Sequence, residues 1–219
     1  MISIELLVVL LAGTILMCIP ISIQMKWYSV ARWKSIVISA VLVLTGVIGS
    51  EIWFFVENLS FGGRSFYGAV VFAPIVFIPV ARLLRISYGD VMDFVAPAGC
   101  LTLAMVKLQC LKDHCCEGKI LYIDENHMYV RFPSQIVELI VFLIISIALM
   151  LISANKKSRN RVFPWFLIIY GAARFGLDFM RDNAASYAFG LSAGSFWSLC
   201  AFVIGIIVLM IMSRKQSNV

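Results

Sequence analysis

The sequence predicts an all-α membrane protein with seven transmembrane helices, an amino terminus outside the cell and a carboxyl terminus in the cytoplasm. Of the 219 residues, 62% are hydrophobic and 14% are charged, which leaves too little polar surface to enclose a soluble core. Seven apolar stretches approach the roughly 20 residues that a helix needs to cross a bilayer. The cytoplasmic segments of this topology hold 11 of the 18 Lys and Arg residues, as the distribution of cations in membrane proteins predicts.

The predicted spans occupy nearly the whole chain. They lie at residues 5–23, 36–55, 66–84, 91–111, 136–153, 163–179 and 195–213. The first is expected to be a retained helix and not a signal peptide, because no Lys or Arg precedes Glu5 and no small-residue cleavage site follows Ile23. Internal repeats are absent, so the simplest organisation is a single membrane domain over residues 1–219.

One connection on the outer side is long, from Leu111 to Pro133. Two apolar runs, Ile120 to Ile123 and Met128 to Phe132, flank a polar segment at residues 124–127. This pattern predicts a short extracytoplasmic β-hairpin.

Seven cations depart from the cytoplasmic pattern and gather near the outer ends of the helices. They are Arg64, Lys107, Lys112, Lys119, Arg131, Arg174 and Arg181. Arg174, Asp178 and Arg181 are spaced so that they share one helix face. Charge within a membrane is costly, and two explanations remain open: an Arg174–Asp178 ion pair that joins helices, or an arginine clamp for a phosphate.

Two further segments carry polar residues beside helix starts. The run GGRSFYG, residues 62–68, predicts a glycine turn that lets backbone N–H groups approach an anion, although such turns are common. Residues 131–135, RFPSQ, open the fifth predicted helix, with Ser134 as a cap; capping does not explain Glu138 one turn further on.

Residues 107–119, KLQCLKDHCCEGK, contain three cysteines and one histidine. A zinc site would lack the second ligand pair that tetrahedral sites usually have, so no metal is predicted. A disulfide on an oxidising outer face and a tight turn of small residues are the other two interpretations. The net charge of +6 reflects topology, and the absence of a long basic tract argues against nucleic acid as a partner.

Five motifs, in order, resemble the prolipoprotein diacylglyceryl transferase family over about Gly49 to Ser198. GGRSFYG (62–68) is similar to the family's GGMSFHGG, DFVAPAG (93–99) to DFIAPL, and RFPSQIVE (131–138) to RHPSQLYE. FLIIYGAARFGLDFMRDN (166–183) is similar to FLIGYGxFRFxVEFFREPD, and LSAGSFWS (191–198) to ISMGQxLS. Residues 114–118, HCCEG, resemble the GCCYG-like wording of a shorter, divergent branch of the family.

The resemblance implies a seven-helix transferase of the bacterial inner membrane. Family enzymes move the diacylglyceryl group of phosphatidylglycerol to the cysteine thiol of a lipoprotein precursor and release glycerol phosphate, with no cofactor. The implied partners are therefore an anionic phospholipid, a lipoprotein precursor peptide and the membrane itself.

The family pattern also assigns candidate site residues. Arg174, Asp178 and Arg181 match the charged residues of the sixth helix, with Asp replacing Glu. The expected catalytic residues are Tyr67, Lys107, Glu117 and Arg174, and those expected to bind lipid or substrate are Gly62, Gly63, Arg64, Gly118, Gln135, Glu138, Asp178 and Arg181. A phosphate clamp of Arg174, Arg181 and Lys107, with Arg64, is expected, while the thiol base is open between Tyr67, Glu117 and His114.

Several family positions differ in this chain. The family histidine is Tyr67, and in GRxGNFINGExxGR the Arg becomes Lys107, the first Asn becomes Cys110 and the Glu becomes Cys115. Lys26-Trp27-Tyr28 resembles the family's WYG, but it follows the first helix instead of opening it, so Tyr28 is not assigned a role. The alternatives are therefore a relative that transfers a glyceryl or head group to another acceptor, and a non-catalytic lipid- or peptide-binding protein; a transporter is disfavoured because inverted repeats are absent.

Overall fold

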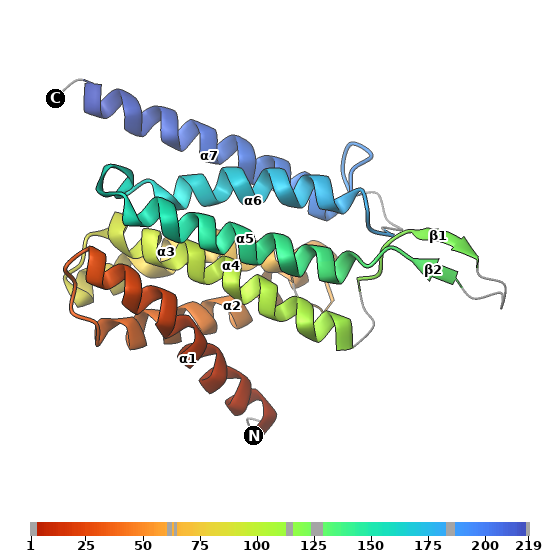
Figure 1. Cartoon of the computed structure of the whole chain (residues 1–219), viewed down its shortest axis with the longest axis horizontal. Helices are drawn as coiled ribbons and strands as arrows, with labels where there is room; N and C mark the ends of the chain where they lie inside the picture. The colour runs from red at the N-terminus through yellow and green to blue at the C-terminus, as the bar shows by residue number, and fades with distance from the viewer. Residues whose placement is uncertain are drawn as a thin grey trace. The chain divides into compact units, whose positions relative to one another are not determined.

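The computed structural model describes residues 4–60, 63, 65–112, 116–123, 129–182 and 187–217. Helices dominate this part of the chain, and one short antiparallel hairpin interrupts them (Figure 1). The elements are α1 (Ile4–Trp27), α2 (Lys34–Asn58), α3 (Phe66–Leu84), α4 (Tyr88–Lys112), β1 (Ile120–Ile123), β2 (Tyr129–Arg131), α5 (Ser134–Ala154), η1 (Lys156–Ser158), α6 (Val162–Asp178) and α7 (Ala193–Ser217). The predicted all-α architecture and the predicted hairpin are confirmed.

Five of the helices are long and apolar enough to cross a bilayer. These are α2, α3, α4, α5 and the segment Ala193–Arg214 of α7. Residues Leu11–Trp27 of α1 form a shorter apolar helix, and α6 has 17 residues. The chain is therefore an integral membrane protein, while the count of seven spans and their orientation stay predictions.

The chain divides into two compact units, and the prediction of one membrane domain stays a prediction. The first unit contains Met1–Gly99 and Met150–Val162, and the second contains Cys100–Leu149 and Phe163–Val219. Helices α4 and α5 each contribute residues to both units.

In the first unit, small residues let α2 and α3 approach closely. A Cβ atom on Gly68 would overlap the carbonyl oxygen of Gly49, and a Cβ atom on Gly49 would lie 3.2 Å from the carbonyl oxygen of Gly68. Glycine pairs of this kind are a common means of packing helices in membranes, where apolar burial gives no driving force between helices.

The first unit also contains a group of buried carboxylates, here called the Asp93 cluster: Tyr28, Asp90, Asp93, Arg159 and the backbone N–H groups of Asn160 and Val162. Asp93 is fully buried; it accepts hydrogen bonds from the Tyr28 hydroxyl at 3.0 Å, Asn160 N at 2.6 Å and Val162 N at 2.9 Å. Arg159 donates two hydrogen bonds to Asp90, at 2.7 and 2.5 Å. Burial raises the pKa of the Tyr28 phenol, which therefore stays protonated and remains a donor. The cluster ties the start of α4 to the segment that leads into α6.

In the second unit, α6 packs against α5 through aromatic rings and against α7 through glycines. Phe142 of α5 and Tyr170 of α6 are buried, with ring centroids 5.7 Å apart. A Cβ atom on Gly171 would lie 2.7 Å from Ser198 O, and one on Gly205 would lie 2.9 Å from Pro164 O. This close approach holds the start of α7 beside the end of α6, where the polar residues of the second unit lie.

The hairpin extends past the start of α5 (Figure 1). Its strands pair Ile120 with Arg131, Tyr122 with Val130 and Ile123 with Tyr129, with an irregular register between Ile120 and Tyr122. Just before β1, Gly118 forms an isolated antiparallel bridge with Arg181, and Lys119 N donates to Met180 O at 3.1 Å. The base of the hairpin therefore fixes the backbone that follows α6.

Candidate functional site

Glu138 lies on the second turn of α5, and its side chain is only 1% exposed. Its nearest cation is Lys107 near the end of α4, whose Nζ lies 2.5 Å from Glu138 Oε2. Burying a carboxylate in an apolar environment is unfavourable unless the charge is compensated. The Lys107 contact supplies the first part of that compensation.

Two arginines approach the other oxygen of the same carboxylate at longer distances. Arg174 Nη1 of α6 lies 4.0 Å from Glu138 Oε1, and Arg181 Nε lies 3.7 Å from it. Arg181 follows the end of α6 and is held there by its backbone bridge with Gly118. These distances exceed those of normal hydrogen bonds, so the two arginines neutralise charge without using their donors on Glu138.

Asp178 forms a second acidic point beside Arg174. Arg174 Nη1 lies 3.1 Å from Asp178 Oδ1, and Asp178 Oδ2 accepts hydrogen bonds from Ser195 Oγ at 2.7 Å and from Ser192 Oγ. A Cβ atom on Gly194 would lie 2.8 Å from Asp178 Oδ1 and 2.9 Å from Arg174 Nη2. The start of α7 therefore holds Asp178 in place, and glycine at 194 leaves room for the ion pair.

The five side chains Lys107, Glu138, Arg174, Asp178 and Arg181 are here called the Glu138 cluster. Three formal positive and two formal negative charges give this group a net charge of +1. Every one of these side chains is at most 16% exposed. A buried surplus of positive charge favours an anion, and arginine donors suit the oxygens of a phosphate.

Two predicted site residues, Glu117 and Gly118, lie just before β1 at the base of the hairpin, outside this cluster. Glu117 Oε2 accepts Arg131 Nε at 3.0 Å, and Arg131 Nη1 lies 2.8 Å from Asp182 Oδ2. The Glu117 side chain is 42% exposed. Gly118 packs so closely against Phe132 that a Cβ atom there would overlap the Phe132 carbonyl oxygen. Gly118 thus shapes the backbone, and Glu117 pairs with a cation outside the Glu138 cluster.

The start of α5 differs in one respect from its predicted role. Ser134 is expected to cap the helix, but its hydroxyl donates to the carbonyl oxygen of Cys116 at 2.7 Å. The reason is that Cys116 precedes the hairpin and Ser134 follows it, so this bond closes the base of the hairpin. Gln135 is buried in the first turn of α5, one turn before Glu138.

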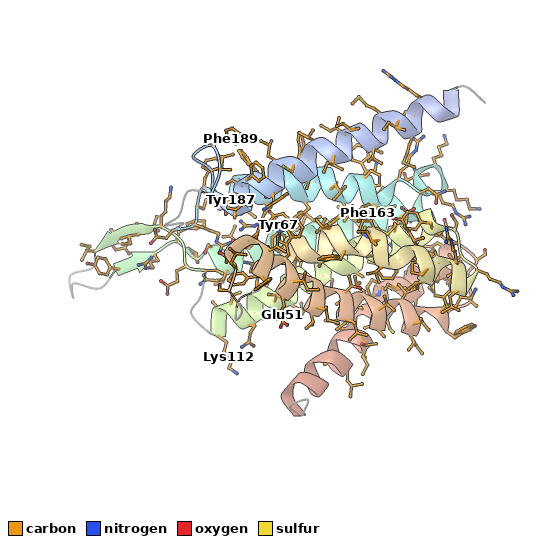
Figure 2. All side chains as sticks on the ribbon, turned by 180° about the vertical axis from the view of Figure 1, so that it is seen from behind. Glu51, Tyr67, Lys112, Phe163, Tyr187 and Phe189 are labelled. Atoms are coloured by element: carbon orange, nitrogen blue, oxygen red, sulfur yellow. The ribbon has the colours of Figure 1, made fainter. Side chains whose placement is uncertain are left out.

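The remaining candidates belong to the first unit or lie outside the described residues. Tyr67, labelled in Figure 2, is buried in the first turn of α3. A Cβ atom on Gly63 would overlap the ring of Phe54, so glycine here lets that ring pack against the backbone. Gly62, Arg64, His114 and Cys115 lie outside the described residues, and the zinc and disulfide interpretations that need them stay open.

Sequence reasoning missed Ser192, Gly194 and Ser195, the residues of the α7 start that surround Asp178. They lie 14 to 17 residues after Asp178, beyond the reach of helical spacing. The available signal was their place in the motif LSAGSFWS, which contains three serines and a glycine at a helix start.

Most of this chain is similar to known proteins. The family model described as prolipoprotein diacylglyceryl transferase matches residues 7–211. A phosphatidylglycerol--prolipoprotein diacylglyceryl transferase of Bordetella avium is 29% identical over 168 residues, which cover 72% of this chain and 64% of that protein. Proteins of the same name are 25% identical in Clostridium tetani, covering 80% of this chain and 79% of the relative, and 30% identical in Xylella fastidiosa, covering 78% and 49%.

The family match includes all five members of the Glu138 cluster and the serines that hold Asp178. The chain spans less than two thirds of the length of the Bordetella avium and Xylella fastidiosa proteins. A match over residues 7–211 nevertheless includes all of α2 to α6 and most of α1 and α7. The chain belongs to the prolipoprotein diacylglyceryl transferase family.

Proposed function

We propose that this chain is a membrane transferase that uses phosphatidylglycerol as donor and the cysteine thiol of a lipoprotein precursor as acceptor. The single observation that carries the proposal is the Glu138 cluster, in which three cations and two carboxylates are buried together with a net charge of +1. A phosphodiester carries one negative charge, so its binding would neutralise the cluster. The names of the relatives supply the reaction type.

The proposed reaction forms one bond and breaks one. The cysteine sulfur attacks the glyceryl carbon of the lipid that bears the phosphate, forming a thioether. The bond between this carbon and the phosphate oxygen breaks, and glycerol phosphate leaves with the electron pair. The thiol proton passes to a base. Negative charge therefore grows on the phosphate during the reaction, and preorganised cations beside it lower the barrier.

Each member of the cluster has a proposed part in this step. Arg174 and Arg181 carry planar guanidinium groups beside Glu138 Oε1, at 4.0 and 3.7 Å, and this geometry matches the oxygens of a phosphate, so we assign both to the phosphate oxygens. Lys107, at 2.5 Å from Glu138, balances the carboxylate that keeps the cations together. Asp178 orients Arg174 at 3.1 Å, and Ser195 orients Asp178.

The base that removes the thiol proton stays a proposal among Tyr67, Glu117 and His114. Glu117 has the exposure that an incoming thiol would need, but its carboxylate is paired with Arg131. A phenol such as Tyr67 has an ordinary pKa of about 10, so it is a weak base at neutral pH unless cations lower that value. Tyr67 therefore has an alternative role in orienting the lipid head group.

The proposed setting is the inner membrane of a bacterium, with seven spans, the amino terminus outside and the site at the outer end of its helices. The placement of the unusual cations supports this orientation, because cations near outer helix ends depart from the cytoplasmic preference and need a functional reason.

The test uses the purified full chain in liposomes that contain either phosphatidylglycerol or phosphatidylcholine, with a lipobox peptide that has one cysteine. Mass spectrometry should detect a thioether-linked diacylglyceryl peptide with phosphatidylglycerol only, and no product from the matching serine peptide. Arg174→Lys keeps the charge and loses the planar donor fork, so we expect product formation to fall at least about tenfold. Arg131→Lys, in the exposed network, is the matched control and should retain activity.

A second candidate function is non-catalytic binding of an anionic lipid. The observation that favours it is the loss of the family histidine at Tyr67 and of the Asn and Glu at Cys110 and Cys115. Selective binding of phosphatidylglycerol without any lipidated peptide would support this candidate. If phosphatidylglycerol is neither bound nor consumed, both functions are excluded.

A further inference from the structure

The segment that leads into α7 contains a tight turn with an unusual residue at its tip. Tyr187 N donates to Leu191 O at 2.8 Å, and Leu191 N donates to Ala188 O at 2.9 Å. The two central residues, Phe189 and Gly190, have φ values of 53° and 76°. Positive φ at both central positions defines a type I′ turn, for which Asn-Gly is the preferred pair.

Phe189 is unfavourable at this position for two reasons. An L-amino acid with a Cβ atom is strained in the left-handed region, and phenylalanine has no side-chain hydrogen bond to offset that strain. Its side chain is also 93% exposed, and the ring contact that the structure gives it is a stacking with Phe196 at 6.5 Å between centroids. Asparagine would relieve both problems in water. Among the residues that the structure describes, nothing buries the Phe189 side chain and offsets this strain; an apolar environment outside the chain would do so.

The place of the turn indicates which environment this is. Leu191 lies two residues before Ala193, where a segment long and apolar enough to cross a bilayer begins. Figure 2 shows Tyr187 and Phe189 on the loop at this end of α7. Phe179 and Met180, directly after the end of α6, are 55% and 45% exposed, and Leu199 of α7 is 43% exposed. Phe189 thus lies within a few residues of the start of an apolar helix long enough to cross a bilayer.

Aromatic residues around the turn support the same assignment. The Tyr187 and Phe196 rings lie 5.7 Å apart, and the Phe196 and Trp197 rings lie 5.1 Å apart. Tyrosine and tryptophan are enriched where a membrane helix enters the interfacial layer, because one end of each ring system is apolar and the other end is polar.

We infer that Phe189 is a membrane anchor that inserts into the interfacial layer of the bilayer and fixes the α6–α7 turn at that depth. The turn presents the ring away from the chain, and lipid covers it. Ser192 directly follows Leu191 and binds Asp178, so the anchor also sets the level at which the α7 start meets the end of α6. The inference does not require catalysis, since it rests on the turn and its surface alone.

The first experiment places a photoreactive benzophenone side chain at Phe189 in the full chain, reconstituted in phospholipid vesicles. Illumination should give covalent lipid adducts at residue 189, identified by peptide mass spectrometry. Ile207, 45% exposed within α7, serves as the lipid-facing reference, and Asp182, exposed beside Arg131, serves as the aqueous reference. Adducts only with a second copy of the chain or with another polypeptide, or a yield no higher than at Asp182, would overturn the inference.

The second experiment separates anchoring from turn stability. With the benzophenone at Tyr187, Phe189→Asn should reduce the lipid adducts, because asparagine suits the turn but not the membrane. Phe189→Trp should retain them, because tryptophan suits the interfacial layer. Equal adduct yields from both variants would show that residue 189 does not set the depth of the turn.

Discussion

The Asp93 cluster and the Glu138 cluster both contain two buried carboxylates, but they satisfy them in different ways. In the Asp93 cluster, backbone N–H groups, the Tyr28 hydroxyl and one bidentate arginine occupy the carboxylate oxygens at 2.5 to 3.0 Å. In the Glu138 cluster, three cations surround the carboxylates, and two of them lie 3.7 and 4.0 Å from Glu138 Oε1. One cluster is closed by hydrogen bonds, and the other holds surplus positive charge.

This difference separates a structural role from a binding role. Buried donors and acceptors that are paired with each other stabilise one conformation and leave nothing for a ligand. Cations that exceed their carboxylates in a low-dielectric site are unfavourable alone and become favourable when an anion arrives. Substitutions in the Asp93 cluster should therefore change stability, and substitutions in the Glu138 cluster should change ligand binding.

The largest effect is expected for Asp93→Ala. This change leaves the Tyr28 hydroxyl and the N–H groups of Asn160 and Val162 without their acceptor. Each buried unsatisfied group costs about 1–3 kcal/mol, so the free energy of unfolding should fall by at least about 3 kcal/mol. Steric trapping in bicelles measures this free energy of unfolding. Asp182→Ala removes an exposed carboxylate and should cost less than about 1 kcal/mol; equal losses for both variants would contradict a structural role for the Asp93 cluster.

The next effect sharpens the other side of the comparison. Arg181→Met removes one cation from the Glu138 cluster, and its formal charge falls from +1 to zero. A charge-assisted hydrogen bond contributes about 1.5–3 kcal/mol, so the affinity for phosphatidylglycerol should fall roughly 10- to 100-fold. The free energy of unfolding should stay within about 1 kcal/mol of that of the unchanged protein. Arg131→Met is the control and should leave lipid affinity unchanged. A strongly destabilised Arg181→Met protein would instead make the cluster structural.

A smaller effect is expected where no charge changes. In Gly194→Ala the new methyl group would press on Asp178 Oδ1 and Arg174 Nη2, at 2.8 and 2.9 Å, and displace the ion pair. Transfer activity should fall about tenfold, equivalent to about 1.4 kcal/mol in the barrier. Gly176→Ala in α6 meets nothing within 4 Å and is the matched control, with full activity expected. Activity that survives in both variants would show that the Arg174–Asp178 geometry is not needed.

The helices and the hairpin could be predicted because their signals are local. Apolar runs of about 20 residues predict helices in a bilayer. The apolar run Ile120 to Ile123, followed by a polar segment and a second apolar run, predicts a β-hairpin. Division into two units could not be predicted, because α4 and α5 are continuous apolar helices whose sequences do not change where the contacts divide them.

The candidate site could be predicted in part. Helical spacing predicted that Arg174 and Asp178 share a helix face. The excess of cations near the outer helix ends indicated Lys107 and Arg181 as further site residues. The central position of Glu138 could not be derived, because it depends on how three segments that are distant in sequence come together. Asp93 opens the motif DFVAPAG, but its buried hydrogen bonds could not be predicted for the same reason: their donors lie 65 to 69 residues away, and nothing near Asp93 in sequence marks them.

The smallest effect is expected for Arg159→Lys, which tests whether the Asp93 cluster depends on its one cation. Lysine keeps the charge beside Asp90 but cannot donate two parallel hydrogen bonds. It also loses part of the contact with the Tyr28 ring, whose centroid lies 4.9 Å from the guanidinium carbon of Arg159. The Arg159 side chain is 49% exposed, so solvent screens the pair, and the free energy of unfolding should fall by less than about 1 kcal/mol. The hydrogen bonds that Arg159 donates to Asp90 raise the pKa of its guanidinium, and lysine also stays charged near neutral pH, so this loss should not vary between about pH 6 and 9. Thermal unfolding in one detergent at several pH values provides the measurement. A loss as large as that of Asp93→Ala would mean that the ion pair, and not the three hydrogen bonds to Asp93, holds this part of the first unit together.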